Sequence, residues 1–248
     1  MKNTSLLFSL CIAAAFSSLV SCGKKDTAAV VNDPSFGEDF DTLSKAVSRG
    51  WVIANNSKPI GTIPWVQGFF YLSQNHMFDG KLGPTNPYNF DGFSGVEMSY
   101  SGSDFAMATA NSGHGSATIS NWLISPVMEV KNGDVISFYT RTASNPADAA
   151  DRLQVRLNPV NSSADVGRDA LSVGNFSEVL LDINPTYLTE GEEGYPGEWT
   201  QYSLTISGLT GSTAKKSRIA FRYFVEDGGP GGSNSVGVGI DKFEFISK

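Results

Sequence analysis

The sequence predicts one large all-β domain. Beyond the first 34 residues, short segments rich in β-branched and aromatic residues alternate with turns made of Gly, Asn, Asp, Ser and Pro. The chain has 26 glycines and 16 phenylalanines, and it lacks the periodicity of a long helix. Sandwiches and barrels often take about 200–250 residues, so one such domain accounts for the length.

The turn residues divide this region into short strands, with 42–49 as the only candidate for a helical turn. The clearest hairpin joins 123–130 to 135–140, because Asn132-Gly133 between them supplies the positive φ angles of a tight turn. Further strands are expected near 36–41, 50–54, 65–71, 95–99, 104–109, 153–157, 176–183, 199–207, 217–226 and 235–246.

Two of these strands carry more information. Segment 217–226 has apolar residues at both parities, which predicts a central strand. In 235–246, the apolar residues lie on one face of the strand before Asp241-Lys242 and on the other face after it. Either a bulge there re-aims the acidic side chain, or both faces of the strand are buried and parity means little.

The first residues predict export and lipidation. Residues 1–21 combine a basic start, a short apolar core and small residues, as a secretory signal peptide does. Leu19-Val20-Ser21-Cys22 resembles the lipobox of bacterial lipoproteins, in which the cysteine carries the lipid; the alternative is an ordinary signal peptide with a chance cysteine. Residues 22–34 are then predicted to be the lipidated Cys22 and a flexible tether, and 35–248 the β domain.

Composition excludes several function classes. No cysteine follows Cys22, which excludes disulfides, zinc–thiolate sites and a cysteine nucleophile in the domain. The formal net charge of −7 disfavours nucleic-acid binding. His76 and His114 each stand alone in polar loops, and no G-x-S-x-G elbow is present.

Four acids form a candidate metal site. Glu38, Asp39 and Asp41 open the first strand, and Asp241 lies near the end of the last. First and last strands of a sandwich are often neighbours, and calcium prefers such oxygen ligands, so these residues are candidates for a structural calcium ion. The alternative is a solvated acidic edge.

Eight ordered motifs together carry a family resemblance from about residue 35 to 247. They are Phe36–Asp41, Gly50-Trp51, Ser120–Pro126, Asn132–Asp134 with Ser137–Arg141, Asp151–Arg156, Trp199–Tyr202, Arg218–Phe224 and Gly239–Asp241. The series resembles the choice-of-anchor J domain family and, more distantly, the cleaved-adhesin domains of secreted bacterial proteases. The resemblance implies a jelly-roll β-sandwich of two antiparallel sheets and calcium held by Asp39, Asp41 and Asp241, with Glu38 beside them. Lys242 departs from the pattern, because adhesin domains often carry a second acid there.

These observations favour a non-catalytic lipoprotein that is anchored to the outer membrane, on its periplasmic or its surface face. Its sandwich is expected to bind a glycan, a protein or a matrix component. Trp51, Trp122 and Trp199 fall in strand motifs and are expected in the core, which leaves Trp65 as the candidate for an exposed ligand-binding ring. The alternative is a glycosidase-like hydrolase with paired carboxylates on the concave sheet.

Overall fold

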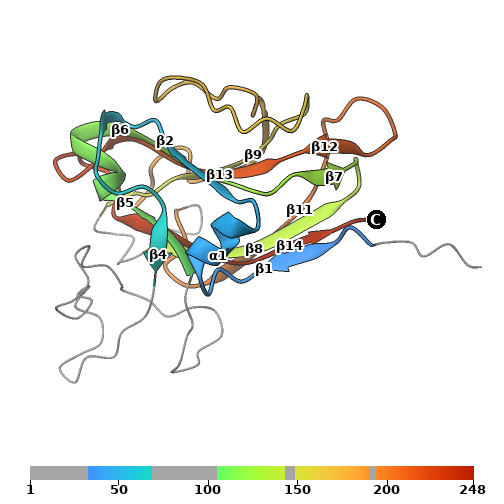
Figure 1. Cartoon of the computed structure of the whole chain (residues 1–248). Helices are drawn as coiled ribbons and strands as arrows, with labels where there is room; N and C mark the ends of the chain where they lie inside the picture. Colours follow the sequence, from blue (N-terminus) through green and yellow to red (C-terminus); the bar gives the residue numbers. More distant parts are fainter. Residues whose placement is uncertain (1–32, 69–104, 143–148, 190–193) are drawn as a thin grey trace, which may run out of the picture. The chain divides into compact units, whose positions relative to one another are not determined.

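The computed structural model describes residues 33–68, 105–142, 149–189 and 194–248 (Figure 1). The predicted signal peptide, Cys22, His76 and the strand expected near 95–99 lie outside the described residues. In the part that is described, no helix is both long and apolar enough to cross a membrane.

Two six-stranded sheets face each other across the core (Figure 1). Sheet A has the order β11 (Thr200–Thr205), β8 (Val135–Thr142), β14 (Gly237–Ile246), β5 (Phe105–Thr109) and β4 (Val66–Gly68), and β1 (Phe36–Glu38) also pairs with β14. Sheet B has the order β10 (Glu178–Ile183), β9 (Leu153–Leu157), β13 (Ile219–Gly228), β6 (Gly113–Ile124) and β2 (Val52–Asn55), and β3 (Lys58–Ile60) also pairs with β6. A small ladder joins β7 (Met128–Val130) to β12 (Lys215–Ser217). The described strand pairs are antiparallel, which confirms the predicted β-sandwich.

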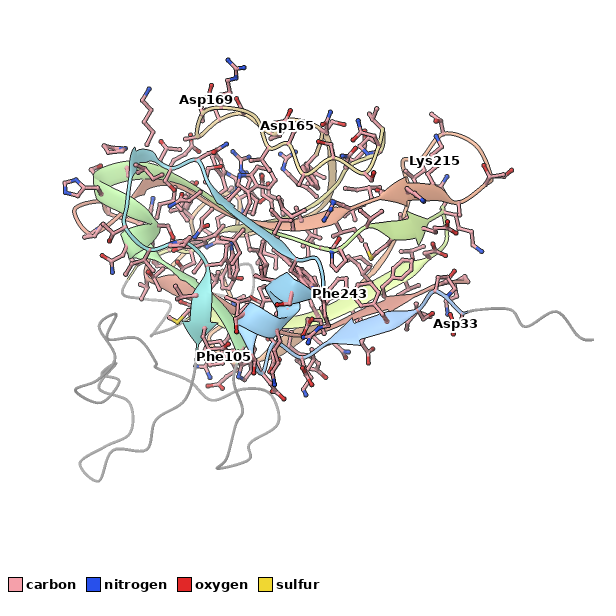
Figure 2. All side chains as sticks on the ribbon, viewed as in Figure 1. Asp33, Phe105, Asp165, Asp169, Lys215 and Phe243 are labelled. Carbon is pink, nitrogen blue, oxygen red and sulfur yellow. The ribbon has the colours of Figure 1, made fainter. Side chains whose placement is uncertain are left out.

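Aromatic rings from both sheets meet in the core. Phe221 of sheet B contacts Phe138 and Phe243 of sheet A, with ring centroids 4.9 and 5.9 Å apart, and Phe243 is fully buried (Figure 2). The short helix α1 (Leu43–Ser48) forms in the segment where the sequence predicts a helical turn, and it buries Leu43 and Ala46 in the same core. Burial of these apolar groups is the main favourable contribution to folding.

The two strands with distinctive patterns behave largely as predicted. β13 lies between β9 and β6, which confirms the central position expected from its apolar residues at both parities. The register of β14 against β8 shifts between Asp241 and Glu244, and Lys242 has φ +49°, which confirms the bulge. The residues of β14 before the bulge are buried at both parities as well, so both interpretations of this strand hold.

The hairpin predicted at Asn132-Gly133 is wrong. β7 pairs with β12, whereas β8 pairs with β11 and β14, so the turn connects the small ladder to sheet A. Gly133 does adopt positive φ, and Asn132 is hydrogen-bonded in both directions to the backbone of Leu209. The turn itself forms as its residues predict, but the partner of each strand is decided by the rest of the chain.

The glycine-rich run that begins at Gly228 packs against the start of β6. Gly229 has φ +88°, and a Cβ atom on it would lie 2.2 Å from the carbonyl oxygen of Gly115. The amide of Gly231 donates to the same carbonyl at 3.1 Å. Only glycine permits both this backbone conformation and this close approach.

We therefore expect Gly229→Ala to lower the free energy of unfolding by about 3 kcal/mol, from backbone strain together with a steric clash. Gly133→Ala is the matched control, because Gly133 also has positive φ (+97°) but has open space where a Cβ atom would lie. The control variant should lose only about 1 kcal/mol. Urea denaturation of both variants measures the difference, and equal losses would contradict the packing explanation.

Candidate functional site

A groove lies along β1, at the position where the chain enters the sandwich. Its volume is about 430 Å³, within the usual range of ligand sites. One wall is β1, another is the connection between β6 and β7, and the segment after α1 completes it. Its lining residues are Pro34, Phe36, Gly37, Glu38, Arg49, Trp51, Pro126, Val127, Met128 and Glu129.

An ion pair lies in this groove. Arg49 Nε donates to Glu38 Oε2 at 2.9 Å, and Arg49 Nη2 donates to Glu38 Oε1, so the pair is bidentate. The Glu38 side chain is only 2% exposed, whereas that of Arg49 is 51% exposed. The hydrogen bond to Glu38 raises the pKa of Arg49 above its usual value. The guanidinium is thus held in one orientation by a buried carboxylate while part of it stays open to solvent.

Aromatic rings support this part of the site. Phe36 is partly buried, and its ring centroid lies 5.7 Å from Phe243 and 6.2 Å from Phe245. Trp51 is almost fully buried, in edge contact with Phe40 and Phe243. These contacts fix the apolar part of the groove on the rigid core.

The four predicted metal ligands do not come together as a metal-binding set. β1 and β14 do pair, with Glu38 opposite Phe243. However, Arg49 engages Glu38, Asp39 and Asp41 are exposed, and Asp241 is buried with Oδ1 accepting from the Lys242 amide at 2.8 Å. No group of three or more His, Cys, Asp or Glu side chains in the described residues is arranged to hold a metal ion. Calcium at these residues stays a prediction that metal analysis of the purified protein would test.

Trp65 is not an exposed ring. It is 2% exposed and belongs to the main core, so the interpretation of Trp65 as a ligand-binding platform is wrong. Pro64 and Gly68 suggest a loop around it, but β4 (Val66–Gly68) begins directly after Trp65 and joins the edge of sheet A. Trp51 and Trp122 are buried as expected, and Trp199 packs partly buried against Phe105.

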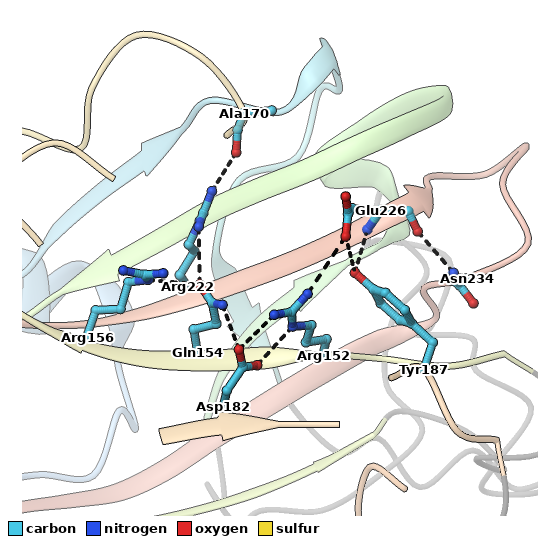
Figure 3. Close-up of polar contacts among 9 residues, drawn as sticks. All are labelled: Arg152, Gln154, Arg156, Ala170, Asp182, Tyr187, Arg222, Glu226 and Asn234. Carbon is cyan, nitrogen blue, oxygen red and sulfur yellow. Dashed lines mark hydrogen bonds and ion pairs between the residues drawn. The ribbon is translucent and has the colours of Figure 1, made fainter. Parts of the chain in front are cut away.

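A second polar cluster lies on sheet B (Figure 3). Arg152 forms a bidentate pair with Asp182, with Nε–Oδ1 and Nη2–Oδ2 distances of 2.9 and 2.7 Å, and it lies 3.8 Å from Glu226. Arg152 also lies over the ring of Tyr187, at 5.7 Å from its centroid. The charged groups of this cluster and the ring of Tyr187 are therefore in contact with other groups of the protein.

Arg222 belongs to the same cluster and has no carboxylate partner among the described residues. It donates to the hydroxyl of Ser120 at 3.0 Å and to the carbonyl of Ala170 at 2.5 Å, and it lies over the ring of Phe224 at 3.9 Å from the centroid. Burial lowers the pKa of Arg222 to about 9, with smaller contributions from the positive charges of Arg156 and Arg152. Arg222 ties the loop that contains Ala170 to the sheet, which is a structural role.

Asp151 is a deeply buried acid within one of the sequence motifs. Its carboxylate accepts from the hydroxyls of Thr142 at 2.6 Å and Tyr223 at 2.5 Å, and from the amides of Val236 and Gly237 at 3.0 and 3.1 Å. Burial raises its pKa, and the four hydrogen bonds oppose that effect. Thr142 belongs to sheet A and Tyr223 to sheet B, so Asp151 links the two sheets and is not accessible to a substrate.

The sequence points to Glu38 as a site residue but does not indicate which residues surround it. Arg49 lies eleven positions away from Glu38, at the end of α1, and Val127 and Glu129 belong to the segment after β6. No local pattern indicates that these segments meet. The Phe36–Asp41 motif predicts the strand that carries Glu38, but its acids suggest a metal site and not an ion pair with Arg49.

Comparisons with known proteins agree with the fold. No family model and no curated protein matches the chain. Among solved structures, the K1 cleaved adhesin domain of Lys-gingipain from Porphyromonas gingivalis W83 is similar with a TM-score of 0.50 and 17% identity, covering 86% of this chain and 98% of that domain. The K2 cleaved adhesin domain of Lys-gingipain has a TM-score of 0.46 and 14% identity, over 86% and 99% of the two chains. A carbohydrate-binding module described as part of the β-sandwich superfamily has a TM-score of 0.42 and 14% identity, over 85% and 62%. The likeness to the K1 domain shows a shared β-sandwich fold.

The ion pair in the groove makes a testable contribution to stability. We expect Glu38→Gln to lower the free energy of unfolding by about 1–2 kcal/mol, because it replaces charge-assisted hydrogen bonds of a buried carboxylate. Glu198→Gln is the matched control, since Glu198 also pairs with an arginine, Arg141 at 3.5 Å, but is 91% exposed. The control should stay within about 0.5 kcal/mol of the unaltered protein. Chemical denaturation of the two variants gives the comparison, and a Glu198 effect as large as that of Glu38 would argue against it.

Proposed function

We propose that this protein is a lipid-anchored lipoprotein of the cell envelope that binds a glycan, without chemically changing it, in the groove along β1. The observation that carries the proposal is the composition of the groove. It combines the aromatic ring of Phe36 and the apolar side chains of Val127 and Met128 with the fixed Arg49–Glu38 pair. Glycan sites need both kinds of group, because a sugar has apolar C–H faces and hydroxyls that require oriented polar partners.

A hydrolytic role has less support. Glycoside hydrolysis requires two carboxyl groups, one of which donates a proton to the leaving oxygen. The acids that line the groove are Glu38 and Glu129. Both carboxylate oxygens of Glu38 accept from Arg49, and Oε1 also accepts from the Phe40 amide at 3.3 Å. This leaves Glu38 as a structural anchor for the guanidinium and favours binding over catalysis.

Glycan binding can be tested with the purified full-length chain on a glycan array, followed by titration of the best ligand. We expect Phe36→Ala to weaken binding about tenfold, because the apolar face of a sugar ring would lose its contact. Tyr187→Ala is the control, since Tyr187 is a partly buried aromatic residue of the Arg152 cluster and lies outside the groove. Thermal unfolding confirms that both variants are folded. Loss of binding in Tyr187→Ala instead would place the site on sheet B, and no binding to any glycan would refute the function.

The anchor is tested separately. Cys22→Ala should abolish incorporation of labelled fatty acid and release the protein from the membrane fraction, because several acyl chains on one residue give stable anchoring. Cys11→Ala is the matched control, since Cys11 lies within the predicted signal peptide and should leave labelling unchanged. A Cys22→Ala protein that stays with the membranes, beside an unaltered protein that takes up no lipid, would reject the lipobox interpretation.

A further inference from the structure

We infer that the groove along β1 selects uncharged glycans over acidic ones, with Arg49 as the residue that orients the ligand. This inference rests on the proposed function and specifies its ligand.

The charges at the groove are matched within the protein. Glu38 and Arg49 neutralise each other through the bidentate pair. On the opposite wall, Glu129 of β7 lies directly across the ladder from Lys216 of β12, and residues opposite each other in antiparallel strands have neighbouring side chains. Each of these two bases therefore has an acid beside it, and neither is a surplus cation that could neutralise a uronate or a sulfate group.

The net charge of the whole chain also disfavours acidic glycans. Its formal net charge is −7, so an anionic ligand approaches against the field of the protein. Inside the groove, an acid group would face the exposed carboxylate of Glu129, while the guanidinium of Arg49 is already paired with Glu38. Like charges placed together in a binding site oppose binding strongly.

An uncharged sugar suits the same groups. Nε and Nη2 of Arg49 bond to Glu38, and Nη1 makes no hydrogen bond or ion pair within the described residues. Its two N–H groups are held in a fixed plane and can donate to sugar hydroxyl oxygens. Glu129, which is exposed on the other wall, can accept from a hydroxyl, and a hydroxyl is able to serve both roles.

The rim of the groove gives the apolar contact. Val127 is 43% exposed, and it lines the groove next to Pro126. An exposed apolar side chain at this place fits the C–H face of a pyranose ring. A charge at position 127 would remove that contact and add an unpaired charge to the groove.

The test uses the full-length protein and pairs of oligosaccharides that differ only in charge: oligomers of glucose against glucuronic acid, and of galactose against galacturonic acid, with and without sulfation. We expect at least one neutral member to bind about tenfold more tightly than its acidic counterpart, and binding to change little with added salt. Val127→Asp should abolish neutral binding, whereas Val179→Asp, which places the same charge on β10 at a valine that is 48% exposed, should leave it unchanged.

The possible outcomes distinguish a failure of the selectivity from a failure of the glycan site. Equal or tighter binding of the acidic members, lost in Phe36→Ala, would overturn the selectivity and keep the glycan site. Equal effects of Val127→Asp and Val179→Asp would overturn the placement of the ligand in the groove. Binding to none of the oligosaccharides would overturn the proposed function together with the inference.

Discussion

The antiparallel pairing of β1 with β14 is the constraint on which the candidate site depends. It joins the first described strand to the last one, with Phe36 opposite Phe245 and Glu38 opposite Phe243. This register places Phe36 on the aromatic core and Glu38 against Arg49. Because a slip by one residue exchanges the two faces of a strand, the same pairing decides which side chains line the groove.

The other polar links hold the sandwich around that pairing. Asp151 receives hydrogen bonds from a threonine of sheet A and a tyrosine of sheet B, and Arg222 ties a long loop to sheet B through backbone carbonyls. These buried groups have their hydrogen bonds satisfied within the protein, so they specify the fold and leave nothing to offer a ligand. The groove differs, because Arg49 is fixed on one side and open on the other.

The sequence pattern predicts the fold class and most strands, because the burial of one or both faces of a strand determines where its apolar residues lie along the chain. The central position of β13 and the bulge at Asp241-Lys242 are both predictable in this way. The hairpin at Asn132-Gly133 fails because a turn fixes local geometry and not the sheet in which each strand pairs. The acids of the first strand suggest a metal set for a similar reason: the guanidinium that engages Glu38 comes from the end of α1, and only the folded chain brings the two together.

In our proposal, this sandwich binds its ligand in the groove along β1. The most direct measurement is a crystal structure of the full-length protein with a neutral oligosaccharide that it binds. We expect a sugar ring in contact with Phe36 and Val127, with a hydroxyl oxygen within hydrogen-bonding distance of Arg49 Nη1. A sugar bound over Tyr187 and Arg152 on sheet B, with the groove along β1 left without ligand, would contradict it.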